Sequence, residues 1–356
     1  MSRSSAAATI ICLIAVVACS PGNAATEPSA TTPSATAVAT VVPSIAPVPS
    51  ATSSGSALPA FEPDEPLTLF GQLTGAGGGV FVMRPDETGM QQLATDILPG
   101  VHKRGDWSPD GQRVVLIDET TERMWIAHLD GTATERVPAC DTPGCDYPSW
   151  SPDGKRIAFS RSESAPGVIG PKAVAIYVVD LATGHVSPVV RLERPLLSDA
   201  PRWSPDGTQI VFQVDRMDDA SFETGASIAV VPVAGGKPRY LTDFDSFATS
   251  PDWGWVTNEI VYGMDLIGLK QTPGPDDDTW DLYAVRPDGS GARRITNVPK
   301  GQLLQSPRWT PDGTRLTAYD HLSGGGILVD PTTGTFEHFV TSGTFTRPLI
   351  RPLPSP

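Results

Sequence analysis

Two cysteines are the first residues whose spacing suggests chemistry. Cys140 and Cys145 stand five positions apart in the stretch Cys-Asp-Thr-Pro-Gly-Cys. In an oxidising compartment, such a pair most simply closes a short disulfide across the Pro-Gly turn. A metal site would need further ligands, and no other His or Cys lies nearby in the sequence, while a redox pair usually has two residues between its cysteines. We therefore predict a structural disulfide, with a metal site or a redox pair as the alternatives.

The other reactive residue types form no recognisable catalytic motif. The sequence contains no Gly-x-Ser-x-Gly turn, no His-Glu-x-x-His helix and no phosphate-binding Gly-Lys-Ser/Thr loop. The acidic run Asp276–Asp278 offers oxygen ligands for calcium, but it lacks the glycine and the distal glutamate of a calcium loop. We therefore predict neither a catalytic residue, nor a cofactor, nor a metal site, with calcium at this run as the alternative.

Charge and composition restrict the partners and the fold class. The chain has a formal net charge of −14, so we expect no nucleic-acid partner, because phosphate binding needs a basic face. The same charge argues against adsorption to anionic lipid through a polybasic patch. The 34 glycines and 36 prolines break helix interiors, which favours many short strands joined by turns.

The first eighteen residues have the pattern of an export signal. Arg3 is followed by an apolar run from Ala6 to Ala18, which is too short to span a bilayer as a finished transmembrane helix. The run ends in Val-Val-Ala-Cys19, which resembles the lipobox of bacterial lipoproteins. That resemblance implies a signal peptide over residues 1–18 and lipidation of Cys19; an ordinary secretory signal cut slightly later is the alternative. We expect an exported protein at the outer face of the cytoplasmic membrane or envelope, with the lipid as its membrane contact.

Residues 19–61 form a segment of different character. From Ser20 to Ala60 the 41 residues are almost wholly Ala, Thr, Ser, Pro and Val, and Glu27 carries the only charge. Such a composition cannot bury enough apolar surface to offset the entropy of ordering the chain. We predict a disordered tether whose ends lie roughly 35 Å apart as a flexible coil; an export remnant without a role is the alternative.

Internal repeats organise residues 62–356. Four copies of a Trp-Ser/Thr-Pro-Asp-Gly motif each precede a strand-like run, and a degenerate fifth copy reads Trp253-Gly-Trp-Val-Thr257. The tryptophans that open the five copies are Trp107, Trp150, Trp203, Trp253 and Trp309. Pro presets φ, Asp bonds its own backbone and Gly adopts the left-handed conformation of a tight hairpin. These aspartates are therefore predicted to make turns, and each tryptophan to pack on the adjoining sheet.

A second repeated unit follows each hairpin. It comprises an aromatic or aliphatic strand, a turn with glycine and another short strand, and its six copies centre on Phe81, Trp125, Tyr177, Ala229, Tyr283 and Ile327. Two strands from each unit make a four-stranded blade, which is the composition of a β-propeller. Six second units against five tryptophan hairpins leave one inner strand missing, and Thr344–Ile350 can supply it beside Leu67–Leu73. We therefore predict an all-β, six-bladed propeller that is closed by its N- and C-terminal strands.

The hairpin followed by Ile/Val-x-Phe and Ile-Tyr-Val-x-Asp resembles the TolB-type propeller repeat of exported bacterial proteins. The resemblance covers nearly the whole chain from residue 62 onward and is more specific for fold than for function. TolB carries an additional N-terminal α/β domain where this chain has the expected anchor and tether, so the resemblance does not transfer its role. Prolyl-oligopeptidase-type enzymes place similar repeats ahead of a hydrolase domain. Only a short segment follows the last repeat here, so we expect no hydrolase domain.

The resemblance also places candidate binding residues, because in this architecture the residues ahead of each tryptophan turn face the central channel and its mouth. They are Arg104, Asp106, Asp146, Tyr147, Asp199, Arg202, Phe247, Gln305, Arg308 and Arg347. His102 would lie near them as a lone polar wall residue. Mixed charges with aromatic rings suit recognition of a polar polymer or of a protein segment.

We therefore expect a monomeric, membrane-anchored lipoprotein whose propeller is a non-enzymatic binding module for a protein or a cell-envelope component. The alternative is an extracytoplasmic polysaccharide lyase or hydrolase with its site in the channel. Such lyases are metal enzymes in which several histidines converge in the channel. Convergence of histidines and carboxylates there would therefore favour the enzyme.

Overall fold

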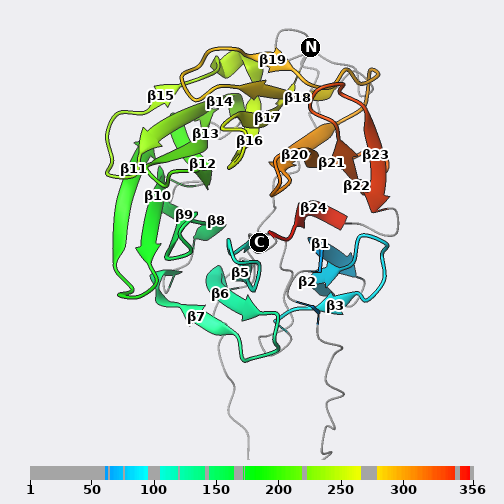
Figure 1. The fold of residues 1–356 in the computed structure, drawn as a ribbon. Helices are drawn as coiled ribbons and strands as arrows, with labels where there is room; N and C mark the ends of the chain where they lie inside the picture. The colour runs from blue at the N-terminus through cyan, green and yellow to red at the C-terminus, as the bar shows by residue number, and fades with distance from the viewer. Residues whose placement is uncertain are drawn as a thin grey trace, which may run out of the picture. The chain divides into compact units, whose positions relative to one another are not determined.

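The folded part of the chain is a ring of β-sheets. The computed structural model describes residues 61–62, 65–74, 77–94, 105–118, 121–140, 144–163, 171, 173–218, 223–265, 279–340 and 345–352. These residues form six four-stranded sheets, which surround a centre as the blades of a propeller (Figure 1). The predicted six-bladed, all-β fold is confirmed. Within these ranges, no helix is both long and apolar enough to cross a membrane.

Five blades use four consecutive strands, from the inner strand to the outer one (Figure 1). The second and third blades are β4 (Gly105–Trp107), β5 (Arg113–Asp118), β6 (Arg123–His128) and β7 (Glu135–Val137), then β8 (Cys145–Trp150), β9 (Arg156–Glu163), β10 (Ala173–Asp180) and β11 (Val186–Glu193). The fourth blade is β12 (Leu196–Trp203), β13 (Gln209–Met217), β14 (Glu223–Pro232) and β15 (Arg239–Tyr240). The fifth and sixth are β16 (Ala248–Trp253), β17 (Ile260–Asp265), β18 (Trp280–Val285) and β19 (Arg293–Arg294), then β20 (Leu304–Trp309), β21 (Leu316–Asp320), β22 (Gly325–Val329) and β23 (Phe336–Val340). Two short 3₁₀ segments, η1 (Pro138–Cys140) and η2 (Phe244–Ser246), precede β8 and β16.

The first blade closes the ring with strands from both ends of the sequence. Its order is β24 (Phe345–Ile350), β1 (Thr68–Thr74), β2 (Gly77–Met83) and β3 (Gln91–Gln92). β24 and β1 are antiparallel, with Leu69 opposite Leu349 and Thr68 opposite Ile350. The predicted closure by terminal strands is therefore confirmed, with strand limits shifted by one residue. Pairing the ends places β1 between β24 and β2, so β1 has no open edge at which another chain could associate.

Arg351, directly after β24, fastens this closure, and the repeat pattern does not predict it. Its side chain is 1% exposed. Nε donates to the carbonyl of Gly111 at 2.8 Å, and Nη1 donates to the carbonyls of Glu62 and Glu65 at 2.9 and 3.1 Å. One guanidinium therefore joins the end of the propeller to its start and to the first tryptophan hairpin.

The tryptophan hairpins have the predicted turn chemistry. In each of the four regular copies the Ser or Thr hydroxyl donates to the aspartate two residues later. The glycine that follows has a positive φ, as at Gly111 (65°), which favours glycine because it has no Cβ. The carboxylates are therefore occupied by their own turns.

The tryptophans pack between adjacent blades. Trp203 is 1% exposed and lies in one cluster with Ile210 and Phe212 of its own blade and with Ile176 of the preceding blade. Its Nε1 donates to the Ser149 carbonyl at 3.1 Å. Trp107 and Trp309 likewise donate to backbone carbonyls of the preceding blade, those of Leu349 and Glu259, so three of the five hairpins are anchored to the neighbouring blade in this way.

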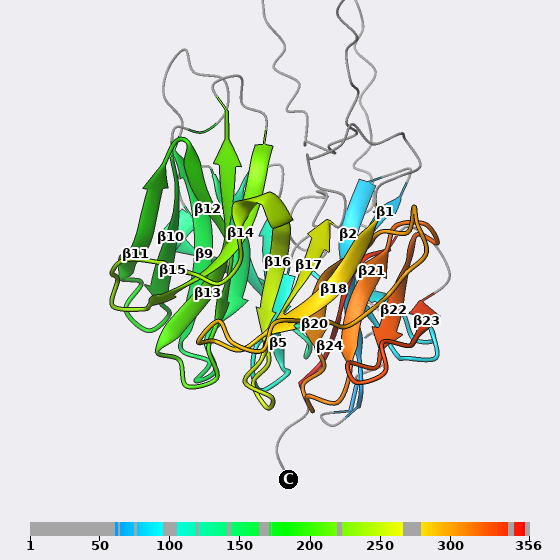
Figure 2. The same cartoon turned by 90° about the horizontal axis from the view of Figure 1, so that it is seen from above.

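The antiparallel order gives the ring two different faces. The hairpin face carries the turns between the first and second strands of each blade. The loop face carries the connections between the second and third strands and those between successive blades. Figure 2 shows the ring from its edge, with short turns on one side. The second strand of the fourth blade, β13, extends toward the loop face as far as Met217, because its pairing with β14 continues beyond the apolar core.

Candidate functional site

The inner strands share an irregularity that shapes the channel wall. The register of β8, β12, β16 and β20 with their neighbours shifts two or three residues before each tryptophan. The residue in the shift has a positive φ in all four strands: Tyr147 (48°), Ala200 (49°), Ser250 (52°) and Ser306 (53°). A bulge of this kind re-aims the side chains of its strand. It separates each strand into a part near the loop face and a part near the hairpin face.

A belt of charged side chains lies on the hairpin side of these bulges. The residue directly before the tryptophan, or before Ile350 in β24, occupies the same place in each blade: Asp106, Ser149, Arg202, Asp252, Arg308 and Leu349. We call Asp106, Arg202, Asp252 and Arg308 the charged belt. Arg202 and Arg308 are only 7% and 8% exposed. Charged groups buried to this degree require partners.

The two carboxylates of the belt join neighbouring blades. Asp106 Oδ2 accepts the backbone N–H of Trp150 at 2.9 Å, and Asp252 Oδ2 accepts that of Trp309 at 2.8 Å. Each carboxylate thereby satisfies a backbone donor of the next blade. Asp252 was not among the residues singled out from the sequence, although its position before Trp253 matches that of the other three and could have identified it.

The two arginines meet around Asp252. Arg308 Nη1 donates to Asp252 Oδ1 at 3.1 Å and to the carbonyl of Pro251 at 3.3 Å. Arg202 Nε lies 3.8 Å from Asp252 Oδ1, and its Nη1 donates to the carbonyl of Pro201 at 2.8 Å. Arg308 Nε is buried and has no hydrogen-bond partner in the part of the chain that the structure describes.

Burial changes the charge balance of the belt. Burial raises the pKa of Asp252 to about 7, against the opposing effect of the Arg202 charge. It also raises the pKa of Asp106, again opposed by Arg202. Asp252 is therefore partly protonated near neutral pH, while the guanidiniums stay charged. The belt consequently carries a net positive charge.

The belt divides the channel into two hollows. One, with about 20 Å³ accessible to water, lies on the loop-face side and is lined by Phe70, Tyr147 and Pro148 as well as by both arginines. The other, with about 90 Å³ accessible to water, lies on the hairpin side and is lined by the belt, by Trp255 and by four inner-strand tryptophans, Trp107, Trp203, Trp253 and Trp309. Arg202 and Arg308 line both hollows, so they form the partition.

Carboxylates gather at the loop-face end of the fourth blade. Asp199 in β12, Asp215 in β13 and Glu223 in β14 form what we call the acidic cluster. Burial, together with the negative charges of Glu223 and Asp199, raises the pKa of Asp215 well above its ordinary value, and burial raises that of Glu223. Such mutual repulsion is relieved when a positively charged group binds. The cluster is therefore suited to a cationic ligand group.

Gln213 connects this cluster to the channel wall. Its Nε2 donates to Asp215 Oδ1 at 2.6 Å, and its Oε1 accepts the backbone N–H of Ser250 at 2.8 Å. Ser250 is the bulge residue of the next inner strand. The amide therefore holds the acidic cluster and the bulge of β16 in a fixed relation.

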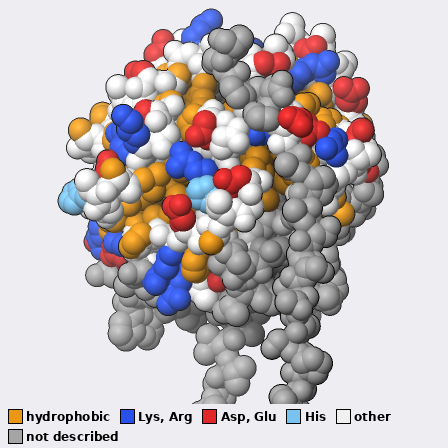
Figure 3. All heavy atoms as spheres, turned by 60° about the horizontal axis from the view of Figure 1, so that its bottom comes forward, with side chains coloured by type: hydrophobic (Ala, Val, Ile, Leu, Met, Phe, Trp, Pro, Cys, Tyr) orange, Lys and Arg blue, Asp and Glu red, His pale blue; other side chains and the backbone are white. Residues whose placement is uncertain are grey.

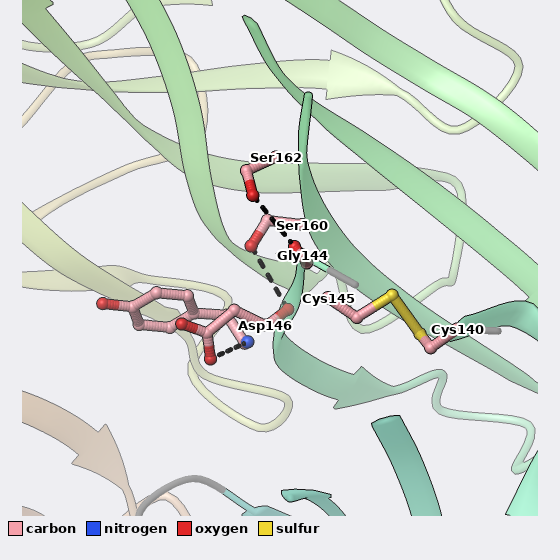
Figure 4. Close-up of a disulfide and its surroundings, with 7 residues drawn as sticks. Cys140, Gly144, Cys145, Asp146, Ser160 and Ser162 are labelled. Atoms are coloured by element: carbon pink, nitrogen blue, oxygen red, sulfur yellow. Dashed lines mark hydrogen bonds between the residues drawn. A yellow bond between two sulfur atoms is a disulfide. The ribbon is translucent and has the colours of Figure 1, made fainter. Parts of the chain in front are cut away.

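The disulfide lies at the same loop-face end, in the third blade (Figure 4). Cys140 at the end of η1 is bonded to Cys145, the first residue of β8, with their Cα atoms 5.9 Å apart. Beyond it, Ser160 Oγ donates to the Asp146 carbonyl at 3.2 Å, and Ser162 N–H donates to the Gly144 carbonyl at 2.9 Å. The bridge thus joins two blades and fixes the chain just before Asp146 and Tyr147.

The structure places the other sequence-predicted residues as follows. Gln305 lies on β20 near the loop face, and its Oε1 accepts a hydrogen bond from His321 Nε2 at 2.8 Å. Phe247 follows η2 with a φ of 45° and is half-buried. Arg347 lies on β24, but its side chain is outside the described set. Outside the described residues lie Cys19, the tether from Ser20 to Ala60, His102, Arg104 and Asp276–Asp278.

The described histidines do not converge on the channel. His128 Nε2 lies 3.2 Å from Glu135 Oε1 on the outer strands of the second blade. On the sixth blade, His338 Nε2 lies 3.2 Å from Asp320 Oδ2 and 3.0 Å from Ser323 Oγ. In a Ser-His-Asp relay, the serine and the carboxylate bond different nitrogens of the histidine ring. Here Ser323 and Asp320 both lie beside Nε2 of His338, so the three residues do not form such a relay. Among the described residues, no group of three potential ligands could hold a metal ion.

The surface of the propeller is chemically mixed. Figure 3 shows acidic and basic side chains interspersed with hydrophobic ones on the face it presents. Six blades, five of them with a tryptophan hairpin, a charged belt and a two-part channel define a β-propeller with its candidate binding site on the central axis.

Comparison with known proteins gives the family. The family model described as the TolB beta propeller domain matches residues 119–352, and the chain belongs to this family. Its fold resembles that of TolB from Acinetobacter baumannii, with a TM-score of 0.59 at 17% identity, over 82% of this chain and 67% of that one. It also resembles a putative TolB from Agrobacterium tumefaciens, with a TM-score of 0.56 at 19% identity, over 81% of this chain and 98% of that one.

Curated relatives correct one expectation. The chain is 26% identical over 62% of its length to dipeptidyl-peptidase 5 of Porphyromonas gingivalis, and 32% identical over 48% to the uncharacterized peptidase YuxL of Bacillus subtilis. It is 24% identical over 72% to the Tol-Pal system protein TolB of Francisella tularensis. It spans 31% and 28% of the two peptidases and 54% of that TolB. The prediction that the chain is not an enzyme is therefore wrong, because the relatives that share its propeller sequence include proteins named as peptidases.

Proposed function

We propose that the propeller is an extracytoplasmic binding module that holds a basic segment of a protein partner at the loop-face end of its channel. The acidic cluster of Asp199, Asp215 and Glu223 carries this proposal. A lysine or arginine entering there would relieve the repulsion that raises the pKa of Asp215, so binding of a cation is favoured over binding of a neutral group.

An extended polypeptide suits the surroundings of this cluster. Tyr147 lines the adjacent hollow and supplies an aromatic face for an apolar or cationic side chain. Bulged inner strands present backbone groups and side chains at regular steps around the channel, which matches a linear ligand better than a compact one. Membership of the TolB propeller family is consistent with a binding role.

The expected location completes the proposal. The apolar run before Cys19 directs export, and a lipid on Cys19 would hold the chain at a membrane surface. Export also supplies the oxidising environment in which the disulfide of Cys140 and Cys145 persists.

Capture of partners by charge variants tests the binding role. The immobilised chain is crosslinked in an envelope extract, and bound protein is compared between the wild type and an Asp199→Asn/Glu223→Gln variant. We expect at least about a fivefold loss of captured protein in the variant, and a similar loss at high salt. The matched control is Asp130→Asn/Asp288→Asn, which removes two charges from exposed outer turns. Equal capture by both double variants would contradict the proposal.

The peptidase relatives favour a second candidate, in which the propeller works with peptidase chemistry and its channel receives a peptide substrate. Chromogenic dipeptide substrates offered to the full-length chain test it. Hydrolysis that stays with the chain through successive purification steps would support this role. The pair of Ser323 and His338 lies away from the channel. A Ser323→Ala variant then tests whether this pair contributes to the hydrolysis.

A further inference from the structure

The fifth hairpin departs from the other four in the residues at its tip. In the regular copies, a Ser or Thr hydroxyl and an Asp carboxylate bond each other and make the tip polar. The fifth has Gly254, Trp255 and Val256 in their place. Its turn closes through Asn258, whose N–H donates to the Gly254 carbonyl at 3.0 Å and whose Oδ1 accepts Trp253 Nε1 at 2.9 Å. Trp255 and Val256 remain 40% and 66% exposed. Turn formation therefore does not account for these two apolar side chains.

Contacts with the sixth blade hold this tip in place. A Cβ on Gly254 would lie 2.8 Å from the indole of Trp309, so only glycine allows the ring to approach this closely. A Cβ on Gly313 would lie 2.7 Å from Cβ of Val256. The fifth and sixth hairpins are therefore in close contact, and Trp255 is presented from a supported backbone.

Trp255 forms part of the wall of the hairpin-side hollow. Other apolar side chains complete this wall: Trp253, Trp309, Pro311, Leu349, Ile350 and Pro352. Aromatic and proline surfaces of this kind favour the burial of a ring or a branched chain. The hollow has about 90 Å³ accessible to water and is open to solvent, which admits part of a small molecule and not a folded partner.

The floor of the same hollow is the charged belt. Arg308 is nine-tenths buried, and its Nε lacks a hydrogen-bond partner among the described residues. A carboxylate oxygen is the acceptor that a guanidinium binds most strongly. Because burial raises the pKa of Asp252 to about 7, the belt's own carboxylates compensate the guanidiniums only in part near neutral pH.

We propose that the hairpin-side hollow binds a small organic carboxylate with an apolar body, whose ring or branched chain packs on Trp255 and whose carboxylate reaches Arg308. This site is separate from the acidic cluster, which lies on the opposite side of the belt and favours a cation. It therefore does not rest on the proposed protein-binding function.

Calorimetric titration of the full chain with three probes tests the ligand class. The first is 3-phenylpropionate, which has both the ring and the charge. The second is 3-phenylpropionamide, which keeps the ring without the charge, and the third is acetate, which keeps the charge without the ring. We expect 3-phenylpropionate to bind with a Kd of about 1 mM or tighter, and the other two to bind at least about tenfold more weakly.

Two variants locate the site. Trp255→Ala removes an exposed side chain, so the fold should persist, and we expect it to weaken 3-phenylpropionate binding about tenfold. Tyr240→Ala, which removes an equally exposed aromatic ring on the outer strand β15, should leave the affinity unchanged.

Three results would overturn the proposal. They are no binding of 3-phenylpropionate up to about 10 mM, equal binding of acid and amide, and unchanged affinity in Trp255→Ala. None of them affects the capture of a protein partner at the acidic cluster, so failure here and failure of the proposed function are distinguishable.

Discussion

The two ends of the channel are built in different ways. At the hairpin face, short turns of one sequence repeat around the ring, and their polar side chains bond within the turn. At the loop face, the connections between second and third strands vary from two residues between β1 and β2 to fourteen between β17 and β18. The acidic cluster and the disulfide both lie at this second end. Regular turns stabilise the ring, whereas irregular connections differ from blade to blade and can carry recognition.

The fifth hairpin shows that whether a turn stabilises the ring or offers a binding surface depends on its side chains, and not only on the face that carries it. Where the motif is intact, its carboxylate is used by the turn. Where the motif is lost, Trp255 is left exposed beside a hollow. A departure from a repeat therefore marks a candidate site even on the regular face. The comparison predicts that changes to the closure on the hairpin face cost stability, and that changes at the loop face cost binding.

Removal of the closing strand should have the largest effect. Deleting residues 345–356 removes β24 and leaves β1 with an unpaired edge, and it also removes the acceptors of Trp107 Nε1 and Thr317 Oγ1. We expect aggregation and loss of cooperative thermal unfolding, measured by circular dichroism and light scattering. A truncated chain that stays monomeric and melts like the full chain would contradict the closure.

Arg351→Ala should have the next largest effect. The substitution leaves three carbonyl groups at the closure without their charged donor, and we expect a loss of about 3 kcal/mol in the free energy of unfolding. Arg293→Ala is the control, because Arg293 is 42% exposed and pairs with Glu259, so its loss should stay below about 1 kcal/mol. Chemical denaturation measures both. Similar losses of unfolding free energy in the two variants would show that Arg351 stabilises the closure no more than an exposed ion pair stabilises the surface.

Replacing Cys140 and Cys145 by serine should be milder and should act mainly at the loop face. The closed loop is very short, so the loss in unfolding free energy should be about 2 kcal/mol. Because the bridge fixes the chain before Asp146 and Tyr147, we expect the variant to capture less of the protein partner than its fraction of folded chain accounts for. Denaturation and capture measured on the same preparation test this. Unchanged capture in the variant would show that the disulfide does not contribute to binding of the partner.

Titration of the belt should give the smallest effect. The pKa of Asp252 is about 7 in the folded chain and near its ordinary value when unfolded, so the folded state holds a proton that the unfolded state has released. Stability should therefore fall as pH rises from about 4 to about 7 and level off above that, and the part of the fall between pH 6 and pH 8 should be about 1 kcal/mol. Asp252→Asn should flatten this part of the profile. An equal slope in the wild type and the variant would assign the dependence to other groups.

The repeat made most of the fold predictable. Tryptophan hairpins and second units specify strand order, blade number and even the origin of the missing inner strand, because each motif performs the same local task in each blade. Arg351 was not predictable, since it belongs to no repeat and acts only when both ends of the chain meet.

The candidate site was predictable in part. Asp106, Arg202 and Arg308 follow from their place before the tryptophans, and the same rule extends to Asp252. Asp215 and Glu223 were missed because they lie on second and third strands, and only the register of β12, β13 and β14 brings them to Asp199. A cluster built across strands has no spacing signal in the sequence.

Site-specific photo-crosslinking tests the central claim, that the loop-face end of the channel binds a protein segment. A photoreactive phenylalanine analogue replaces Tyr147 in one chain and Tyr240, on the outer strand β15, in another. Irradiation in intact cells should join the first chain to a discrete protein partner, and Asp199→Asn/Glu223→Gln should abolish that adduct, while the second chain should give none. Crosslinks from Tyr240 with none from Tyr147 would contradict the claim and move the binding surface to the outer strands.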